Sequence, residues 1–290
     1  MAAILVCGGS GFIGSHVADA LTDAGHDVRI FDRDASKYLS VGQQMIIGDM
    51  MDAAALDFAA AGCEVVYNLA GIAHLDDSLD RPLETAQVNI IGNLHALEAA
   101  RKSGAKRFVY ASSVYVYSRH GSFYRVSKQA SEGFVELYAE QYGLQYTILR
   151  YGSLYGRRSN DRNGIYRMLD QALRERSISY GGNGEALREY IHVTDAAKLS
   201  VQVLGAEYVN RHLTLSGHER VPVRTLMQMV SEMMGGVALA WGSRQHEGHY
   251  EITPYAFTPR PGHKLVANDY VELGQGILDC LAEHQERLAK

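Results

Sequence analysis

Short apolar runs rich in β-branched residues alternate with longer segments in which apolar residues recur at helical spacing. The runs predict buried strands at Ile4–Val6, Val28–Phe31, Met45–Ile47, Val65–Leu69, Phe108–Ala111 and Tyr146–Leu149. The longer segments predict helices at Phe12–Ala24, Asp52–Ala61, Glu84–Ser103 and Tyr124–Tyr142. Strands and helices in this order are typical of parallel βαβ units. The first half of the chain therefore predicts an α/β fold built on a doubly wound parallel sheet.

The pattern loosens after Arg150, where glycines divide the chain into shorter pieces, as in the run Gly181-Gly182-Asn183-Gly184. Helical spacing predicts helices near Ile165–Arg176, Thr194–Leu204, Val223–Met234 and Val271–Glu286, with little parallel-strand signal between them. We therefore expect two parts. Residues 1–150 form the sheet domain, and residues 151–290 form a smaller C-terminal lobe that binds the substrate, with an approximate boundary and a return of the chain to the sheet domain left open.

A glycine-rich turn joins the first predicted strand to the first predicted helix. Its glycines allow the backbone to turn tightly and to approach a pyrophosphate, whose charge is then met by the helix N-terminus. The turn therefore predicts a dinucleotide site of the Rossmann type. The residues expected to contact the cofactor here are Gly8, Gly11, Phe12, Ile13 and Gly14.

Asp32 ends the second predicted strand, at the spacing of roughly 20 residues where a carboxylate accepts a hydrogen bond from the adenine ribose. Such a carboxylate repels the 2′-phosphate of NADP, so NAD is the predicted cofactor. Arg33, the next residue, would instead attract that phosphate. The two residues therefore leave NADP open as the alternative.

Charge and cysteine content narrow the class of protein. The net charge of −5 gives no basic field for a phosphate backbone, so we expect no nucleic-acid partner. Cys7, Cys63 and Cys280 have neither disulfide nor zinc-site spacing, which predicts a reducing compartment and no metal. No export signal and no apolar run of about 18 residues is found, so we expect a cytoplasmic protein outside the membrane.

Tyr124 and Lys128 are four residues apart on a predicted helix, which places both side chains on one face. The strand before them ends in Ser112 and Ser113, so polar groups converge where a nicotinamide would lie. An ammonium about 5 Å from a phenol is worth roughly 3 kcal/mol, or about two pKa units. Tyr124 is therefore predicted to act as a base on a substrate hydroxyl, whose oxygen Ser113 holds.

These blocks together resemble the extended short-chain dehydrogenase/reductases, the NAD-dependent epimerase/dehydratase group, over nearly the whole chain. Within that group the chain is most similar to sugar-nucleotide epimerases of the UDP-glucose 4-epimerase kind. The matching blocks are Gly48-Asp49, Asn68-Leu69-Ala70-Gly71, Val88-Asn89, Ala111-Ser112-Ser113, Tyr124 with Ser127-Lys128, Leu149-Arg150, Tyr155-Gly156, Arg188-Glu189-Tyr190-Ile191-His192-Val193 and Arg260-Pro261-Gly262.

The resemblance implies roles for residues that spacing alone does not identify. It implies further cofactor contacts from Asp49, Met50, Leu69, Ala70, Gly71, Asn89, Ser112, Tyr124 and Lys128. It implies that Arg188 binds the diphosphate of a nucleotide sugar and that Arg260 provides a second phosphate contact. Ser153 stands where the family often has a substrate-binding asparagine.

The two residues after Ser113 distinguish the reactions of this family. Relatives that act as 4,6-dehydratases carry an Asp-Glu pair there, and decarboxylases need the glutamate, whereas this chain has Val114 and Tyr115. The resemblance therefore favours 4-epimerisation through a transient 4-keto sugar. The alternatives are an NADPH-consuming ketoreductase and, in another class, a non-catalytic dinucleotide sensor.

Helices 84–103 and 124–142 carry apolar residues on more than one face. Leu94, Leu97, Phe134 and Leu137 exceed what packing on one sheet requires. We therefore predict a homodimer through these two helices, and the family resemblance implies the same interface.

Overall fold

The computed structural model describes residues 1–242 and 249–255. Arg260 and the helix expected at Val271–Glu286 lie outside these residues. The first half comprises β1 (Ala3–Cys7), α1 (Phe12–Asp23), β2 (Asp27–Asp32), β3 (Gln43–Ile47), α2 (Ala53–Ala60), β4 (Val65–Asn68), α3 (Leu75–Asp80), α4 (Pro82–Ala86), η1 (Gln87–Ile91), α5 (Gly92–Ser103), β5 (Arg107–Ser113), η2 (Val114–Tyr117), α6 (Ser122–Tyr142) and β6 (Gln145–Tyr151). The second half comprises β7 (Ser153–Tyr155), α7 (Gly164–Glu175), β8 (Ser177–Tyr180), β9 (Leu187–His192), α8 (Val193–Gln202), η3 (Ala206–Tyr208), β10 (Arg211–Leu215), β11 (Arg220–Pro222), α9 (Val223–Met233) and β12 (Ala238–Trp241).

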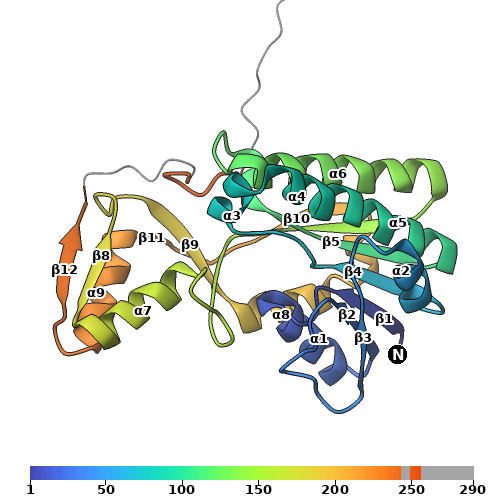
Figure 1. Cartoon of the computed structure of the whole chain (residues 1–290), viewed down its shortest axis with the longest axis horizontal. Helices are drawn as coiled ribbons and strands as arrows, with labels where there is room; N and C mark the ends of the chain where they lie inside the picture. The colour runs from blue at the N-terminus through green and yellow to red at the C-terminus, as the bar shows by residue number, and fades with distance from the viewer. Residues whose placement is uncertain (243–248, 256–290) are drawn as a thin grey trace, which may run out of the picture. The chain divides into compact units, whose positions relative to one another are not determined.

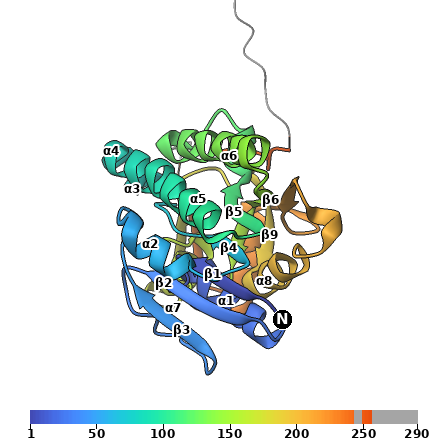
Figure 2. The same cartoon turned by 90° about the vertical axis from the view of Figure 1, so that its right-hand side faces the viewer.

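A seven-stranded sheet with the order β10-β6-β5-β4-β1-β2-β3 forms the centre of the sheet domain. All neighbouring strands in it run parallel. One core lies between the sheet and helices α1 and α8, and a second lies between the sheet and helices α2, α5 and α6. Figures 1 and 2 show these helices on the two faces. The prediction of a doubly wound α/β fold is confirmed.

The second half does not follow the expected pattern. Sequence predicted little parallel-strand structure there, and this was wrong, because β10 pairs in parallel with β6 at the edge of the main sheet. Helix α8 packs on α1, so residues 193–215 return to the sheet domain. The substrate lobe is built from two smaller sheets, β11-β9-β7 and β12-β8, with a separate core beneath α7 and α9.

The long helix predicted at 84–103 is divided into three consecutive helical segments. Between α4 and α5 the chain forms one stretch of π-helix over Gln87–Ile91. A π-helical turn shifts the residues that follow it around the helix axis, and such turns are frequent at functional sites. Here the π-helix carries Asn89, which is buried. None of the helices in the described ranges is both long and apolar enough to cross a membrane.

Candidate active site

The turn after β1 requires glycine at two positions, Gly8 and Gly14. Gly8 has φ of 78°, and a Cβ atom on it would lie 2.5 Å from the backbone nitrogen of Ala70. A Cβ atom on Gly14 would lie 2.0 Å from the carbonyl oxygen of Gly8. Glycines at these positions therefore let strand, turn and helix α1 approach each other closely. Helix α1 begins without a side-chain cap at Gly11, which leaves its N-terminal N–H groups directed to this turn.

A cavity of about 190 Å³ lies at the carboxyl ends of β1, β2 and β4. It brings together most of the residues predicted to bind the cofactor, while Phe12, Ile13 and Gly14 lie in the adjoining first turn of α1. The predicted residues in its lining are Gly8, Gly11, Asp32, Asp49, Met50, Leu69, Ala70 and Gly71.

The Asp32 carboxylate is held at the mouth of this cavity by the turn itself. Its Oδ2 accepts a hydrogen bond of 3.0 Å from the backbone N–H of Ser10. Arg33 lines the same cavity. A glycine cradle with a carboxylate at this edge fits the pyrophosphate and the adenine ribose of a dinucleotide.

Asn89 shapes the loop that follows β4. Its Oδ1 accepts from the backbone N–H of Ile72 (2.8 Å), and its Nδ2 donates to the carbonyl of Ile72 (2.9 Å) and to Ser127 Oγ (2.9 Å). These bonds occupy the whole amide, so Asn89 holds the loop beside α6. Its place between the cofactor cavity and the Tyr124–Lys128 helix explains why it belongs to the predicted site.

Ser113, Tyr124 and Lys128 come together as predicted, and all three are buried. Ser113 ends β5, and its hydroxyl lies near enough to the Tyr124 phenol to lower the phenol's pKa. The Lys128 Nζ atom donates to the carbonyl of Ala111 (2.8 Å) and lies 5.8 Å from the centroid of the Tyr124 ring. The three side chains therefore form one polar group at the carboxyl end of β5.

The pKa values of Tyr124 and Lys128 differ from those that the sequence led us to expect. Burial raises the pKa of Tyr124 to about 12, against the smaller effect of the Ser113 hydroxyl. Burial also lowers the pKa of Lys128 to about 8. The sequence argument considered the charge of Lys128 and omitted desolvation, which disfavours both ions. In the protein alone, the phenol is thus protonated at neutral pH.

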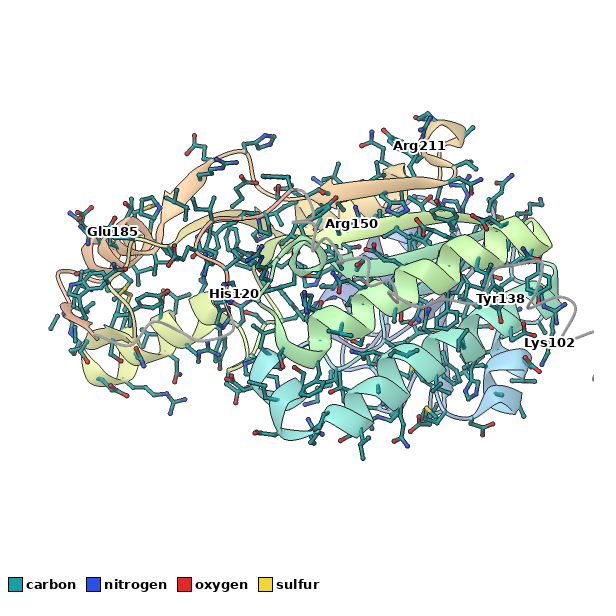
Figure 3. The ribbon with its side chains drawn as sticks, turned by 90° about the horizontal axis from the view of Figure 1, so that it is seen from above. Lys102, His120, Tyr138, Arg150, Glu185 and Arg211 are labelled. Carbon is teal, nitrogen blue, oxygen red and sulfur yellow. The ribbon has the colours of Figure 1, made fainter. Side chains whose placement is uncertain are left out.

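Ser112 points away from the catalytic group. Its Oγ donates to Glu132 Oε1 at 2.5 Å, and Glu132 forms a salt bridge of 2.6 Å with Arg150. Arg150 lies on β6 beside α6 in the view of Figure 3. The Ser112 hydroxyl therefore anchors the end of β5 to helix α6. The sequence had predicted a cofactor contact for Ser112, whose hydroxyl is bound to Glu132 instead. Sequence reasoning identified Arg150 only as part of a family block and did not identify Glu132.

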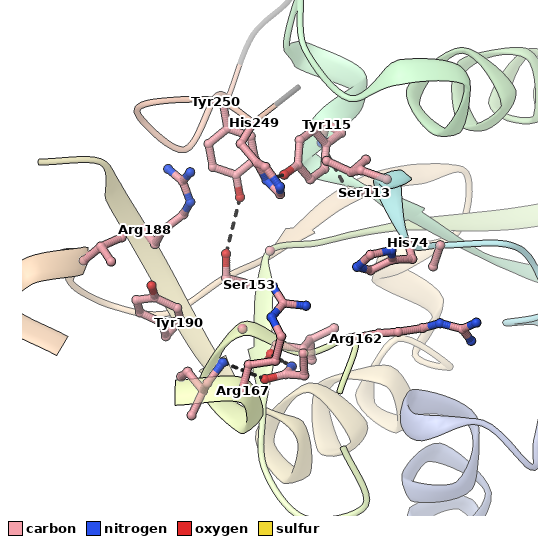
Figure 4. A pocket seen from close by; sticks show the side chains of 18 of the residues that line it. His74, Ser113, Tyr115, Ser153, Arg162, Arg167, Arg188, Tyr190, His249 and Tyr250 are labelled. Atoms are coloured by element: carbon pink, nitrogen blue, oxygen red, sulfur yellow. Dashed lines mark hydrogen bonds between the residues drawn. The ribbon is translucent and has the colours of Figure 1, made fainter. Parts of the chain in front are cut away.

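A larger cavity of about 330 Å³ opens next to Ser113 and extends into the substrate lobe (Figure 4). Ser153 and Arg188, two of the predicted substrate residues, line it. Arg188 Nη1 donates to the carbonyl of Glu251 (3.2 Å), and its Cζ lies 4.4 Å from the centroid of the Tyr250 ring. Ser153 Oγ lies 3.4 Å from the Tyr250 hydroxyl. The third predicted substrate residue, Arg260, is outside the described residues.

Several lining residues were not predicted from the sequence as site residues. Tyr115, which the sequence analysis considered only as a position without a carboxylate, lines the cavity with His249, and the two share a hydrogen bond of 2.6 Å between the tyrosine hydroxyl and Nδ1. Arg162 and Arg167 line it from the loop before α7 and from α7 itself. His249, Arg162 and Arg167 belong to no motif that we recognised, and only the fold brings them to Tyr115. Within residues 1–242 and 249–255, no cluster of three or more potential metal ligands occurs.

Known proteins resemble this chain in both sequence and structure. A putative UDP-glucose 4-epimerase of Methanocaldococcus jannaschii is 28% identical over 94% of this chain and 95% of its own. A UDP-N-acetyl-alpha-D-glucosaminuronate decarboxylase of Bacillus cytotoxicus is 25% identical over 90% of this chain and 88% of its own. The crystal structure of UDP-glucose 4-epimerase from Thermotoga maritima with UDP-glucose has a TM-score of 0.79 and 27% identity, covering 88% of this chain and 90% of that one.

Residues 4–214 match the sequence model of the NAD dependent epimerase/dehydratase family. This segment runs from β1 into β10, so it includes the glycine turn, the serine at the end of β5 and the tyrosine–lysine pair of α6. The resemblance to extended short-chain dehydrogenase/reductases is thus confirmed, and NAD as the cofactor is confirmed at the level of the family. By the extent of this match, the chain belongs to the NAD dependent epimerase/dehydratase family.

Proposed function

We propose that this protein is an NAD-dependent nucleotide-sugar 4-epimerase that works through a transient 4-keto sugar. The observation that carries the proposal is the buried group of Ser113, Tyr124 and Lys128, in which Lys128 Nζ lies 5.8 Å from the centroid of the Tyr124 ring and Ser113 lines the larger cavity. The names of the M. jannaschii and T. maritima relatives support the same reaction.

Each residue of the catalytic group has a defined task in this reaction. Ser113 holds the oxygen at C4 of the sugar, and Tyr124 takes the proton from that oxygen and later gives it back. Bound NAD supplies the hydride chemistry at the carbon. The pKa of Tyr124 is about 12 in the protein alone, and the positive charge of an oxidised nicotinamide beside the phenol would lower it.

The residues after Ser113 support epimerisation over elimination. Val114 is buried and apolar. Burial raises the pKa of Tyr115, whose hydroxyl is bound to His249, so the position holds a neutral phenol. Dehydration and decarboxylation, which the resemblance associates with a carboxylate here, are therefore disfavoured. Because one relative is a decarboxylase, the test of the proposed function also looks for the products of both reactions.

A ketoreductase is the second candidate. Arg33 lines the cofactor cavity beside Asp32 and would meet the 2′-phosphate of NADP. It would consume one reduced cofactor for each product. A non-catalytic dinucleotide sensor is the third reading, and the buried Ser113, Tyr124 and Lys128 group argues against it.

We also infer a homodimer through α4, α5 and α6. The residues at its interface differ from those that the sequence suggested. Leu97 is fully buried, while Leu94 and Phe134 pack against the second core. Leu137 alone of the predicted four is exposed, and with Phe123, Val126 and Gly133 it recurs along one face of α6. This apolar face supports the dimer.

The test of the proposed reaction is a panel of nucleotide sugars incubated with the protein and a trace of NAD. We expect an isomer of unchanged mass, recognised by its proton spectrum, without net cofactor turnover. Loss of water or carbon dioxide would establish one of the disfavoured reactions. Turnover only with stoichiometric NADPH and a keto sugar would establish the ketoreductase.

A further inference from the structure

The larger cavity carries an excess of positive charge. Among the described residues, its lining contains the guanidinium groups of Arg162, Arg167 and Arg188 but only one carboxylate, that of Asp76. A cavity with this lining favours a ligand with more than one negative charge. The proposed nucleotide-sugar substrate supplies a diphosphate, which the resemblance assigns to Arg188. The charge of the remaining two arginines is then still to be explained.

The arginines differ in how far their charge is already compensated. Arg162 Nη2 pairs with Asp77 Oδ2 at 3.0 Å. Arg167 Nη1 donates only to the backbone carbonyl of Asp161 (2.9 Å), and Arg188 donates to the carbonyls of Leu187 and Glu251. Among the described residues, neither Arg167 nor Arg188 forms a salt bridge with a carboxylate. Arg188 is buried and Arg167 is exposed, and both guanidinium groups bring an uncompensated charge to the lining of the cavity.

Arg167 is held in place by the way helix α7 begins. The Asn163 side chain accepts from the N–H of Ile165 (3.0 Å), and its amide donates to the carbonyl of Leu154 (2.7 Å). These two bonds cap the helix and tie it to β7, next to Ser153. Figure 4 shows Arg167 reaching from α7 toward Ser153, while Arg188 lies apart from it beside Tyr250.

The surroundings of the two arginines indicate which part of a substrate each would meet. Arg188 lies on β9 with Tyr190, in the small sheet of the substrate lobe. Arg162 shares its side of the cavity with His74, which lies in the loop after β4 (Figure 4). Strand β4 ends in the loop that lines the cofactor cavity. The side with His74 is therefore nearer to the reacting end of the substrate.

We propose that the sugar of the substrate carries a carboxylate, as in a nucleotide-linked uronic acid, and that Arg167 binds this carboxylate with Arg162 beside it. The proposal rests on the proposed function and specifies its substrate class. A guanidinium binds a carboxylate through two parallel charge-assisted hydrogen bonds, which a neutral hydroxymethyl group cannot form. A neutral sugar would leave the charge of Arg167 without an anion.

The test compares UDP-glucose with UDP-glucuronate, which differ only in the group at C6 of the sugar. Binding of each to the NAD-loaded protein is measured by titration calorimetry for the wild type, Arg167→Gln and Arg174→Gln. Arg174 is the matched control because it lies two turns further along α7 and pairs with Asp170, outside the cavity lining. Direct binding is the readout, so the result does not depend on which reaction follows.

We expect the wild type and Arg174→Gln to bind UDP-glucuronate about tenfold more tightly than UDP-glucose, as a charge-assisted pair would give. Arg167→Gln should remove most of this preference. Equal losses for both ligands in Arg167→Gln would place the arginine on the diphosphate and overturn the proposal, as would a wild type without preference. Failure of the wild type to bind either ligand would overturn the proposed function as well.

Discussion

Glu132 and Arg150 form a buried salt bridge behind the end of β5, with 2.6 Å between Oε2 and Nη2 and side-chain exposures of 7% and 8%. Glu132 also accepts from Ser112 Oγ, and Arg150 donates from Nε to the same carboxylate at 2.9 Å. The pair therefore connects β5, β6 and α6 directly behind Ser113. Neither Glu132 nor Arg150 lines the cofactor cavity or the larger cavity, so we infer that the pair supports the catalytic group from behind.

Glu132→Gln should lower the free energy of unfolding by about 3 to 5 kcal/mol, because it leaves the buried Arg150 charge without its counterion. Denaturant unfolding measures this change. Asp170→Asn, which breaks the exposed pair with Arg174, serves as the control and should cost less than about 1 kcal/mol. If the two substitutions lowered the free energy of unfolding equally, the Glu132–Arg150 pair would not have the stabilising role described here.

Lys128 should make the stability of the cofactor-free protein depend on pH. Burial lowers its pKa from 10.5 to about 8, so between these values the unfolded chain binds more protons than the folded one. The free energy of unfolding therefore rises with pH in this window. Between about pH 7.5 and 9.5, we expect the wild type to gain about 2 kcal/mol relative to Lys128→Met. Parallel stability curves for the two proteins would refute the burial of a charged Lys128.

Asp32 should determine the choice of cofactor. Asp32→Ala removes the carboxylate that lines the cofactor cavity. The affinity for NAD should therefore fall about tenfold, and the preference for NAD over NADP should decrease. Calorimetric titration with both cofactors checks this. Asp34→Ala is the neighbouring control, since Asp34 is absent from the cavity lining. A wild type that prefers NADP would show that Arg33 is decisive instead.

The apolar face of α6 should control association. Leu137→Asp places a charge in the middle of the proposed interface and should convert a dimer into a monomer, as measured by light scattering at micromolar concentration. Leu173→Asp, on the exposed face of α7, should leave the mass unchanged. A wild type that is monomeric under these conditions rules out the interface.

The sheet domain was predictable because its signals are local. Buried parallel strands are continuous apolar runs, and the glycine turn lies directly between a strand and a helix. Strand β10 was missed because Arg211–Leu215 is short, partly polar and at the sheet edge. Its identity depends on pairing with β6, more than 60 residues earlier, which no local pattern reveals.

The candidate site was predictable only in part, for a similar reason. Tyr124 and Lys128 share one helix, so their spacing predicts their proximity. Their pKa values depend on burial, which the sequence does not show, and Tyr124 accordingly shifted in the direction opposite to the expected one. Arg167 faces the cavity because Asn163 ties α7 to β7, a contact between side chain and backbone that helical periodicity does not contain.

The central claim is an internal return of hydride at C4, and the fate of a deuterium at that carbon tests it most directly. The nucleotide sugar that reacts in the panel is prepared with deuterium at C4 and incubated with the protein and a trace of NAD. Tyr124→Phe should slow the reaction at least about a hundredfold, whereas Tyr142→Phe, at the exposed end of the same helix, should not. We predict an isomer of unchanged mass that retains its deuterium at C4. Deuterium appearing in stoichiometric reduced cofactor, or full activity of Tyr124→Phe, would contradict the account.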